Sequence, residues 1–392
     1  METRQVCFDR VTMFHSIIPY ILIAPPLCYG LISLFCARRY FTRKPPEGEF
    51  RPPVTILKPV KGVDAESFEN FASFCEQQYP CFQIVFAVAA EDDPAAPVIR
   101  RLMDEFPSVD IDLVIDGRIH GPNYKVCNLM HAYPRAKHDI LIVCDSDIRV
   151  GPDYLREVAS LFRDDSVGLV TSLYRSPRVR NIPTALEAMG FTTEMIPNVM
   201  VALSLEGLTF ALGASMAVRR EALERIGGFR ALVEYLADDY QLGNMVYRAG
   251  YRLELSSCFV ESVMKRESLR GILSRQLRWA RTMRASRPAG YFASGITQPV
   301  PAMLLALLAS GFSFAGWSAV AILGFSRLLV GLAFSRAFVR DGLFPRYLAL
   351  LPFRDVLAFG TWALSFLGNR VVWRSRTFRV LPGGTIRDLG EA

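Results

Sequence analysis

The segment HDILIVCDSDIRV, residues 138–150, carries Asp145 and Asp147 at the end of an apolar run. The run is apolar on both faces, as expected for a strand in a mostly parallel sheet that helices cover. In open α/β sheets, ligands bind beyond the carboxyl ends of the strands. The segment therefore predicts a buried central strand that delivers two carboxylates to a ligand site.

Strand-like and helix-like segments alternate on the N-terminal side of this run. The segments VTILKPV (54–60), QIVFAVAA (83–90) and DIDLVID (110–116) have the composition of strands. Helical spacing occupies the intervals between them, in DAESFENFASFCEQQY (64–79) and VIRRLMDEF (98–106). The order predicts the front half of a nucleotide-binding α/β sandwich.

Side chains two residues apart on a strand point the same way, so Asp145 and Asp147 should converge. Two adjacent carboxylates repel, and a divalent cation between them removes the conflict. Hard oxygen ligands suit Mg²⁺ or Mn²⁺. A solvated turn with capping aspartates is the alternative, and the two residues alone do not exclude it.

The chain also has the composition of a membrane protein. Of its 392 residues, 51% are hydrophobic, and the mean hydropathy is +0.22. Residues 15–35 contain no Asp, Glu, Lys or Arg, and about 20 such residues suffice to cross a bilayer. We expect a membrane anchor here, with a cleaved signal peptide as the alternative. The basic cluster that follows marks the cytoplasmic side: Arg38, Arg39, Arg43 and Lys44.

The C-terminal part contains further apolar stretches. Residues 298–326 are free of charge, and a stretch at 347–367 is interrupted only by Arg354 and Asp355. Between them, residues 327–342 have the pattern of an interfacial amphipathic helix. The sequence thus predicts an anchor with a basic flank, a cytosolic domain, and C-terminal membrane segments with a basic cytosolic tail: 1–44, 45–297 and 298–392.

Cysteine spacing and net charge exclude some other classes. The eight cysteines show no paired metal-binding spacing, and in a cytosolic domain they are expected to be reduced core residues. The net charge of +7 is explained by arginines that flank the membrane segments. No basic run with interleaved aromatic residues stands apart from them, so nucleic acid is not an expected partner.

Three more patterns carry charged groups that could serve a ligand site. Asp92 and Asp93 follow a strand and can reach a nucleotide, although Asp93-Pro94 is also an ordinary helix start. Asp238 and Asp239 open a predicted helix, where the helix dipole favours acids in any case. The third pattern, RQLRW at 275–279, is basic at helical spacing and has a lipid-surface face as its alternative.

Taken in order, these patterns resemble the signature of lipid-directed and processive glycosyltransferases of the A fold. The matching residues are Asp93, Asp145-Ser146-Asp147, Asp239 and RQLRW. Five segments are similar to the ceramide glucosyltransferase family and its bacterial hopanoid-biosynthesis-associated relatives: ILKPVKGVD (56–64), DDPA (92–95), NYKVCNLM (123–130), CDSDIRV (144–150) and GLVTSLYR (168–175). The resemblance covers about residues 50–290. One departure is Asp147, where animal ceramide enzymes typically have Gly.

The resemblance implies the glycosyltransferase-A fold and an inverting transfer of glucose or N-acetylglucosamine from a UDP-sugar to a lipid hydroxyl. The acceptor would be ceramide or a hopanoid, and the protein would lie in the bacterial inner membrane with its catalytic domain in the cytosol. It assigns Asp239 as general base, and Asp145 and Asp147 as ligands of Mg²⁺ or Mn²⁺. It assigns nucleotide-sugar binding to Asp92, Asp93, Lys125, Asp145, Arg275, Arg278 and Trp279.

Two other classes use part of the same pattern. A processive polysaccharide synthase would have the same motifs, but it is expected to have more membrane helices. A non-catalytic membrane scaffold would explain the apolar segments but not the acidic and basic signatures.

Overall fold

The structure is a computed structural model that describes residues 2–43, 49–374 and 376–391, with side chains described from residue 16 onward. Lys44 and the predicted domain boundary beside it lie outside the described residues. Contacts divide the chain into two units. The α/β unit comprises Arg43–Thr184, Leu205–Glu267 and Arg370–Ala392, and the helical unit comprises Met1–Thr42, Ala185–Ser204 and Ser268–Asn369.

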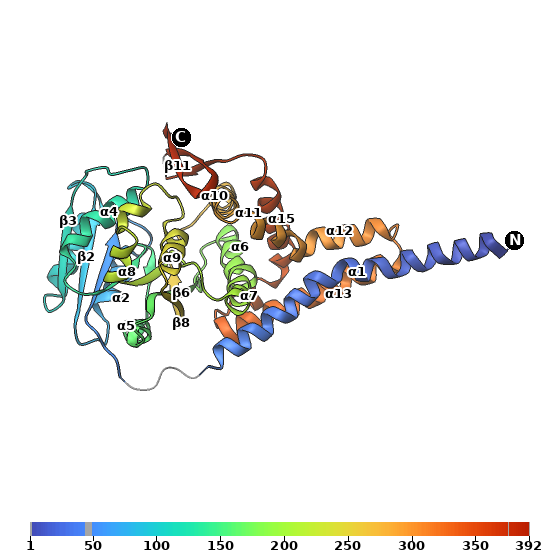
Figure 1. The fold of residues 1–392 in the computed structure, drawn as a ribbon, viewed down its shortest axis with the longest axis horizontal. Coiled ribbons are helices and arrows are strands. Elements are labelled where there is room, and N and C mark those ends of the chain that lie inside the picture. Colours follow the sequence, from blue (N-terminus) through green and yellow to red (C-terminus); the bar gives the residue numbers. More distant parts are fainter. Residues whose placement is uncertain (1, 44–48, 375, 392) are drawn as a thin grey trace. The chain divides into compact units, whose positions relative to one another are not determined.

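The α/β unit is built on one sheet with the strand order β3-β2-β1-β4-β7-β6-β8-β5 (Figure 1). Its strands are β1 (Val54–Pro59), β2 (Phe82–Val88), β3 (Asp110–Ile115), β4 (Ile140–Cys144), β5 (Ile148–Arg149), β6 (Val167–Arg175), β7 (Ser215–Arg219) and β8 (Arg252–Ser262). β3, β2, β1 and β4 are parallel neighbours, as are β6 and β8, whereas β7 runs antiparallel to β4 and β6. The sheet is therefore mostly parallel, which confirms the predicted fold class.

Strand β4 is the central strand that the opening segment predicts. All five of its residues are buried, and it pairs with β1 in the register Ile56↔Ile142. On one face, Ile56 and Ile142 pack in a core with apolar residues of the covering helices α2 (Ser67–Cys75), α3 (Ala95–Glu105) and α5 (Tyr154–Ser160). Helix α4 (Tyr124–Ala132) contacts β1 and β2, and helix α9 (Asp238–Arg248) contacts β6 and β8. Helices thus cover the sheet that contains β4.

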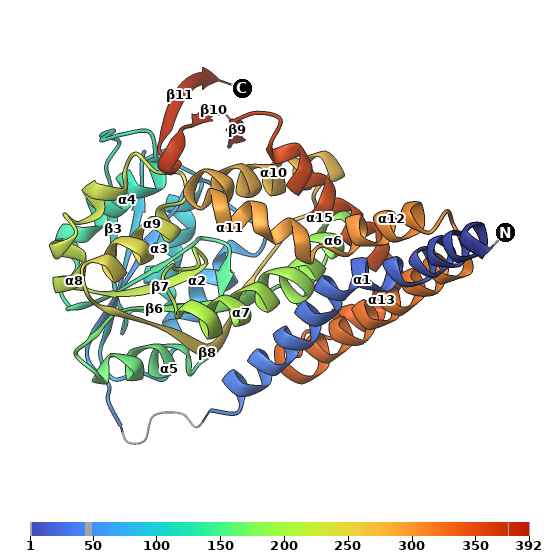
Figure 2. The ribbon, with the colours of Figure 1, turned by 45° about the vertical axis from the view of Figure 1, so that its right-hand side comes forward.

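Among the residues that the structure describes, the helical unit contains three helices that are long and apolar enough to cross a membrane, judged by length and composition. They are Ser16–Phe41 within α1 (Glu2–Phe41), Phe314–Val339, which begins with α13 (Phe314–Ala333), and Leu348–Ser365, which includes α15 (Leu351–Ser365). A further pair, Pro288–Thr297 and Pro299–Ala309, is bent by 53° and counts as one broken span or a re-entrant loop. Figure 2 shows α1 and α13 running side by side.

Two helix predictions differ from the structure. Residues 298–326 do not form one helix, because α12 (Pro299–Ala309) ends before Gly311 and Phe312, whose φ angles of 60° and 58° reverse the chain. Residues 327–339 do not form a separate interfacial helix. They comprise the last part of α13 and the π-helical segment Phe334–Val339 that follows it directly. The charge that suggested an interface is compensated inside the unit, since Arg327 pairs with Asp355 at 2.6 Å.

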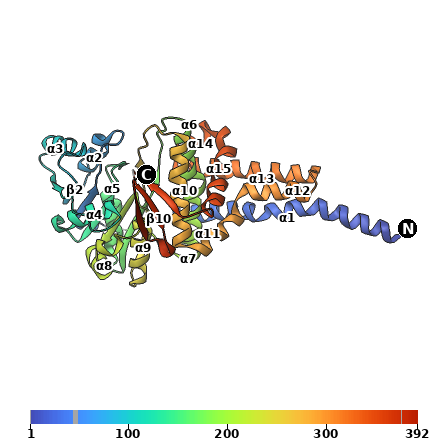
Figure 3. The same cartoon turned by 90° about the horizontal axis from the view of Figure 1, so that it is seen from above.

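Helices α12 and α13 form a hairpin that packs along α1 (Figure 3). Their shared core consists of Ile23, Ala302, Ala306, Ala319 and Leu323. The alanines let the helix backbones approach closely, as is typical of helices that pack within membranes.

Candidate active site

Parallel strands β1 and β4 end at the same edge of the sheet, and the loop after β4 begins with Asp145. The Asp145 carbonyl oxygen accepts a hydrogen bond from Lys58 Nζ at 3.1 Å. The Asp145 N–H donates to the carbonyl oxygen of Ala214 at 3.4 Å. The backbone that presents the Asp145 carboxylate is therefore fixed from β1 and from the segment before β7.

Lys125, in the first turn of α4, joins carboxylates from two elements. Its Nζ lies 2.8 Å from Asp145 Oδ1 and 3.2 Å from Asp238 Oδ2. Asn123 caps α4 by accepting a hydrogen bond from the Val126 N–H, and its Nδ2 donates to Asp238 Oδ1 at 3.2 Å. Burial alone would lower the pKa of Lys125, but the carboxylates of Asp145 and Asp238 raise it above its ordinary value. The lysine stays charged and links the β4 loop to the start of α9.

Asp239 lies beside this link, in the first turn of α9. Its Oδ1 accepts a hydrogen bond from the Tyr240 N–H at 2.8 Å. Its Oδ2 lies against Gly213, where an added methyl group would come within 2.7 Å of that oxygen. Burial, and next the charge of Asp238, raise the pKa of Asp239 to about 6. At neutral pH the carboxylate is mostly ionised, yet it is more basic than an ordinary aspartate.

Asp147 completes a group of acids at the end of β4. Burial, followed by the charges of Asp145 and Asp64, raises the pKa of Asp147 to about 7. The hydroxyl of Ser262 donates to Asp147 Oδ2 at 3.4 Å, and the hydroxyl of Ser146 donates to Asp64 Oδ2 at 2.9 Å. The three carboxylates give this end of the strand an excess of negative charge.

Lys58 is a site residue that the sequence analysis missed. It lies fully buried in β1, and its Nζ sits 3.8 Å from the centre of the Phe74 ring. Burial lowers the pKa of Lys58 to about 8. The signal was present in the sequence, because a lysine inside an apolar strand is rare without a polar partner.

Asp92 and Asp93 lie on the loop after β2. Asp93 accepts hydrogen bonds from the Gly62 N–H at 2.9 and 3.1 Å and from the Ala95 N–H at 2.9 Å. It thereby caps the start of α3 and ties it to the loop after β1, whereas the neighbouring Asp92 is exposed. The structure gives Asp93 a structural role, and its contact with a nucleotide stays a prediction.

Arg275, Arg278 and Trp279 lie on α10 (Leu269–Ser286), which belongs to the helical unit. Arg275 forms two bonds with the buried Glu187, at 2.7 and 2.6 Å. Arg278 stacks over Trp279 with its guanidinium carbon 6.0 Å from the ring centre. The structure thus brings Asp145, Asp147, Asp239 and Lys125 together in the α/β unit, and places the basic motif in the other unit.

The C-terminal strands are the second feature that the sequence analysis missed. In place of a basic tail alone, the chain forms an antiparallel sheet of β9 (Arg370–Trp373), β10 (Arg376–Val380) and β11 (Ile386–Glu391). The carbonyl oxygen of Gly383, in the turn between β10 and β11, accepts a hydrogen bond from Gln241 Nε2 at 3.0 Å. Arg376 stacks on Tyr124, the neighbour of Lys125, at 5.4 Å. The end of the chain therefore braces both helices that carry site residues, α4 and α9.

Known proteins resemble this chain over most of its length. Ceramide glucosyltransferase 3 of Caenorhabditis elegans is 28% identical over 279 residues, which are 71% of this chain and 61% of that protein. Ceramide glucosyltransferase 1 of the same organism is 25% identical over 345 residues, which are 86% of this chain and 73% of that protein. The chain thus spans less than two thirds of the length of the first of these relatives.

A solved structure establishes the fold. Mannosyltransferase PcManGT from Pyrobaculum calidifontis, in complex with GDP-Man and Mn²⁺, matches with a TM-score of 0.56 at 20% identity, covering 90% of this chain and 98% of that one. This likeness concerns the fold alone, which is the glycosyltransferase-A fold. The model of the family described as "Glycosyl transferase family 21" matches residues 18–386. Because that match takes in nearly the whole chain, the protein belongs to glycosyl transferase family 21, the family of the ceramide glucosyltransferases.

Proposed function

We propose that the protein is a membrane-bound, inverting glycosyltransferase that moves a hexose from a UDP-sugar to the hydroxyl of a membrane lipid, either ceramide or a hopanoid. The observation that carries this proposal is the meeting of Asp239, Lys125 and Asp145 at one edge of the sheet. This arrangement places the Asp239 carboxylate, which can act as a base, next to the positively charged Lys125, which can bind a diphosphate. Family membership and the three membrane-length helices support the lipid acceptor.

In the proposed reaction, Asp239 removes the proton from the acceptor hydroxyl as its oxygen attacks the anomeric carbon. The bond from that carbon to the diphosphate oxygen breaks, and its electron pair leaves with UDP. A pKa of about 6 suits this step, since the base is ionised at neutral pH but still accepts a proton. One displacement inverts the anomeric centre and requires no second carboxylate as nucleophile.

A divalent cation of the Mg²⁺ or Mn²⁺ type fits the residues at the end of β4. Burial, and next the charges of Asp145 and Asp64, raise the pKa of Asp147, and a cation beside these carboxylates would favour their ionised forms. No group of three or more His, Cys, Asp or Glu side chains able to hold a metal occurs within the described part of the chain. Mg²⁺ does not need such a group, because it often takes one or two protein carboxylates plus phosphate oxygens. When bound by Asp145 and Asp147, the ion would neutralise the departing diphosphate.

The remaining assignments complete the proposal. Asp92 and Asp93 would contact the uridine end of the donor, and Lys125 its phosphates. Arg278, with Arg275 and Trp279, would bind the diphosphate end, and Arg275 also pairs with Glu187. We place residues 45–297 on the cytosolic face of a bacterial inner membrane, because the basic cluster after α1 favours that side.

The test of the proposed function is direct transfer. The purified full chain would be incubated with UDP-glucose or UDP-N-acetylglucosamine and either ceramide or a hopanoid polyol, with the product lipid identified by mass and its anomeric configuration by NMR. A β-linked hexosyl lipid is the expected product from an α-linked donor. Absence of a product with each pair, or an α-linked product, would contradict the proposal.

We predict an acid limit of activity near pH 6. A carboxylate base works only when ionised, and the pKa of Asp239 is raised to about 6, so protonation removes the base as pH falls below that value. The value of kcat/KM should fall about tenfold per pH unit below this point. A profile that stays level down to pH 4.5 would show that another group takes the proton.

We predict that Gly213→Ala lowers kcat about 10- to 100-fold with little loss of stability. The new methyl group would press on Asp239 Oδ2 at 2.7 Å, so the carboxylate must move away from its present position. Gly151→Ala is the matched control, because no atom lies within 4 Å of its added methyl group. Steady-state assays would give kcat, and thermal unfolding would show whether the two variants have the same melting temperature. Equal kcat values in the two variants would refute the placement of the base.

A further inference from the structure

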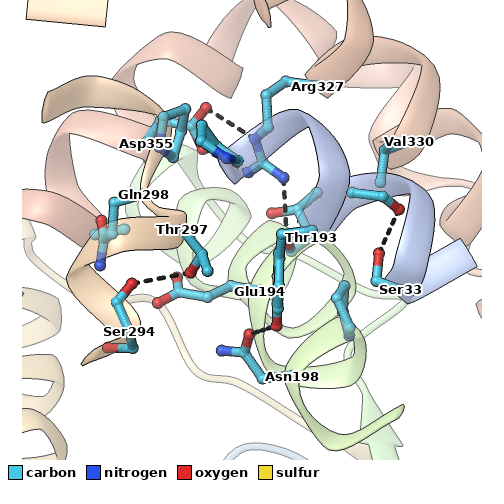
Figure 4. A pocket seen from close by; sticks show the side chains of 16 residues that line it. Ser33, Thr193, Glu194, Asn198, Ser294, Thr297, Gln298, Arg327, Val330 and Asp355 are labelled. Carbon is cyan, nitrogen blue, oxygen red and sulfur yellow. Dashed lines mark hydrogen bonds and ion pairs between the residues drawn. The ribbon is translucent and has the colours of Figure 1, made fainter. Parts of the chain in front are cut away.

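A polar cavity lies inside the helical unit, where α12 begins (Figure 4). Its walls come from α1, α7 (Ile196–Glu206), α13, α15 and the residues on either side of Gln298. The cavity volume is about 90 Å³. Its polar lining includes Tyr29, Glu194, Asn198, Thr297, Gln298 and Arg327.

Ion pairs hold the walls of this cavity. Arg327 binds Asp355 through two bonds, at 2.6 and 3.2 Å, and its Nη1 donates to the carbonyl oxygen of Thr193 at 3.3 Å. Glu194 pairs with Arg354. Arg327 and Asp355 lie on two helices of membrane-spanning length. Ionisable groups in such helices are costly and typically mark a functional pathway or binding site.

Polar groups that can still form hydrogen bonds line the same cavity. For the Gln298 side-chain amide, the described residues provide no hydrogen-bond partner, and Figure 4 shows it at the cavity beside Thr297. The Thr297 hydroxyl donates to the Ser294 carbonyl at 2.9 Å, which leaves its oxygen able to accept. Figure 4 also shows the Glu194 carboxylate extending toward Ser294 and Thr297. A ligand with hydroxyl or amide groups would satisfy this set.

An apolar surface leads away from the cavity along the α12–α13 hairpin. Its exposed side chains include Leu304, Leu305, Leu308, Phe314, Trp317 and Phe325, between 51% and 88% exposed. The eleven residues of α12 extend roughly 16 Å, about half of the hydrocarbon thickness of a bilayer. A polar cavity at the base of an apolar hairpin of this length matches an amphipathic ligand with one hydroxylated end and a hydrocarbon body.

We infer that this cavity is the holding site for the lipid acceptor, with the hydroxylated head against Gln298, Thr297 and Glu194 and the hydrocarbon part along the α12–α13 hairpin. The inference rests on the proposed function and adds where the acceptor is bound. These three side chains are positioning residues, because they hold the acceptor and take no part in bond making.

The kinetic test compares variants of the full chain in phosphatidylcholine nanodiscs. Gln298→Leu and Thr297→Val should each raise the KM for the acceptor about fivefold, the effect of about one hydrogen bond, and leave kcat and the KM for the UDP-sugar unchanged. Thr361→Val is the matched control, since the Thr361 hydroxyl also donates to helix carbonyls, at 2.9 and 3.0 Å, and Thr361 does not line the cavity. An unchanged acceptor KM in both cavity variants would overturn the inference and leave the proposed transfer intact.

A binding measurement separates the two claims. A ceramide and a hopanoid polyol, each with a diazirine on the hydrocarbon part, would be photolysed with the wild type, Gln298→Leu and Asp239→Asn. Asp239→Asn should be labelled like the wild type, and Gln298→Leu about fivefold less. The lipid whose labelling falls is the one the cavity holds. Equal labelling of all three proteins, or displacement by the same excess of phosphatidylglycerol, would refute the cavity even where transfer occurs. If the wild type transfers sugar to neither lipid, the proposed function fails and the labelling alone decides the inference.

Discussion

Asp239→Asn is expected to reduce kcat by about a thousandfold and to raise the melting temperature at pH 7. The loss follows from removing the base, because general base catalysis contributes about 10²- to 10⁴-fold. The fold should persist, since Asn has nearly the same shape and its side-chain oxygen can still accept the Tyr240 N–H bond at 2.8 Å. Single-turnover transfer to ceramide or a hopanoid polyol measures the chemical step directly.

The stability gain follows from the sign of the pKa shift. The folded chain raises the pKa of Asp239 from 3.8 to about 6, so burial of the ionised form opposes folding above pH 6. At pH 7 the buried charge lowers the free energy of unfolding by at most about 3 kcal/mol, at about 1.4 kcal/mol per pKa unit. This effect disappears as pH falls from 6 toward 3.8, because the folded state then binds the proton more tightly.

The control for Asp239→Asn is Asp104→Asn, an exposed position on α3. It should change neither kcat nor the melting temperature. Melting curves at pH 5 and pH 7 complete the measurement, since the difference between Asp239→Asn and the wild type should shrink at the lower pH. An Asp239→Asn protein that turns over at the wild-type rate would remove Asp239 from the reaction.

The sequence predicts the α/β unit well because its signals are local. The segment at 138–150 contains a short run that is apolar on both faces, as is typical of a buried strand, and β4 occupies Ile140–Cys144 as expected. Asp145 and Asp147 lie beyond the end of β4, in the turn that leads into β5, so their closeness comes from this turn and not from the strand alternation on which the prediction was based. Asp239 at the start of α9 follows from the same rules of helix composition.

The parts that could not be predicted depend on contacts between distant segments. The break between α12 and α13 arises at Gly311 and Phe312 in a run that is apolar throughout, so hydropathy does not mark it. In the sequence, Arg327 indicates an interfacial helix, because its ion pair with Asp355 is visible only in the structure. The strands β9 to β11 lie in a segment whose arginines suggested only a membrane flank, and their short alternating pattern gives a weak signal.

Lys125→Met is the second change for which we expect a large effect, a loss of about 3–5 kcal/mol of stability, or roughly 10 °C in melting temperature. The ammonium of Lys125 is the cation that lies between Asp145 and Asp238, at 2.8 and 3.2 Å. Without it, the carboxylates of Asp145, Asp238 and Asp239 repel one another, and the Asp238 side chain is only 8% exposed, whereas that of Asp145 is 38% exposed. Removing one partner of a buried ion pair costs more than the pair itself contributes, because the charge left on the nearly buried Asp238 has little contact with solvent.

The double variant Lys125→Met with Asp238→Asn tests this reason. It should recover part of the lost stability, since one of the unpaired carboxylates is then neutral. Thermal unfolding of the two single variants and the double variant gives the coupling between the side chains. Strictly additive losses would mean that Lys125 stabilises the chain by packing rather than by charge.

Lys58→Met is the matched comparison, because both lysines are buried in the same unit but their pKa values move in opposite directions. Burial lowers the pKa of Lys58 from 10.5 to about 8, so its charge opposes folding at pH 7. A methionine would keep the contact with the Phe74 ring, now 3.8 Å from Nζ, and remove that opposition. Methionine also loses the hydrogen bond from Lys58 Nζ to the Asp145 carbonyl oxygen, at 3.1 Å, and the two effects offset each other, so we expect a nearly unchanged melting temperature. The wild type should gain stability relative to Lys58→Met between pH 8 and 10.5, where the folded chain has lost a proton that the unfolded chain still holds. Equal losses in Lys125→Met and Lys58→Met at pH 7 would contradict the view that neighbouring carboxylates, and not burial alone, decide what each lysine contributes.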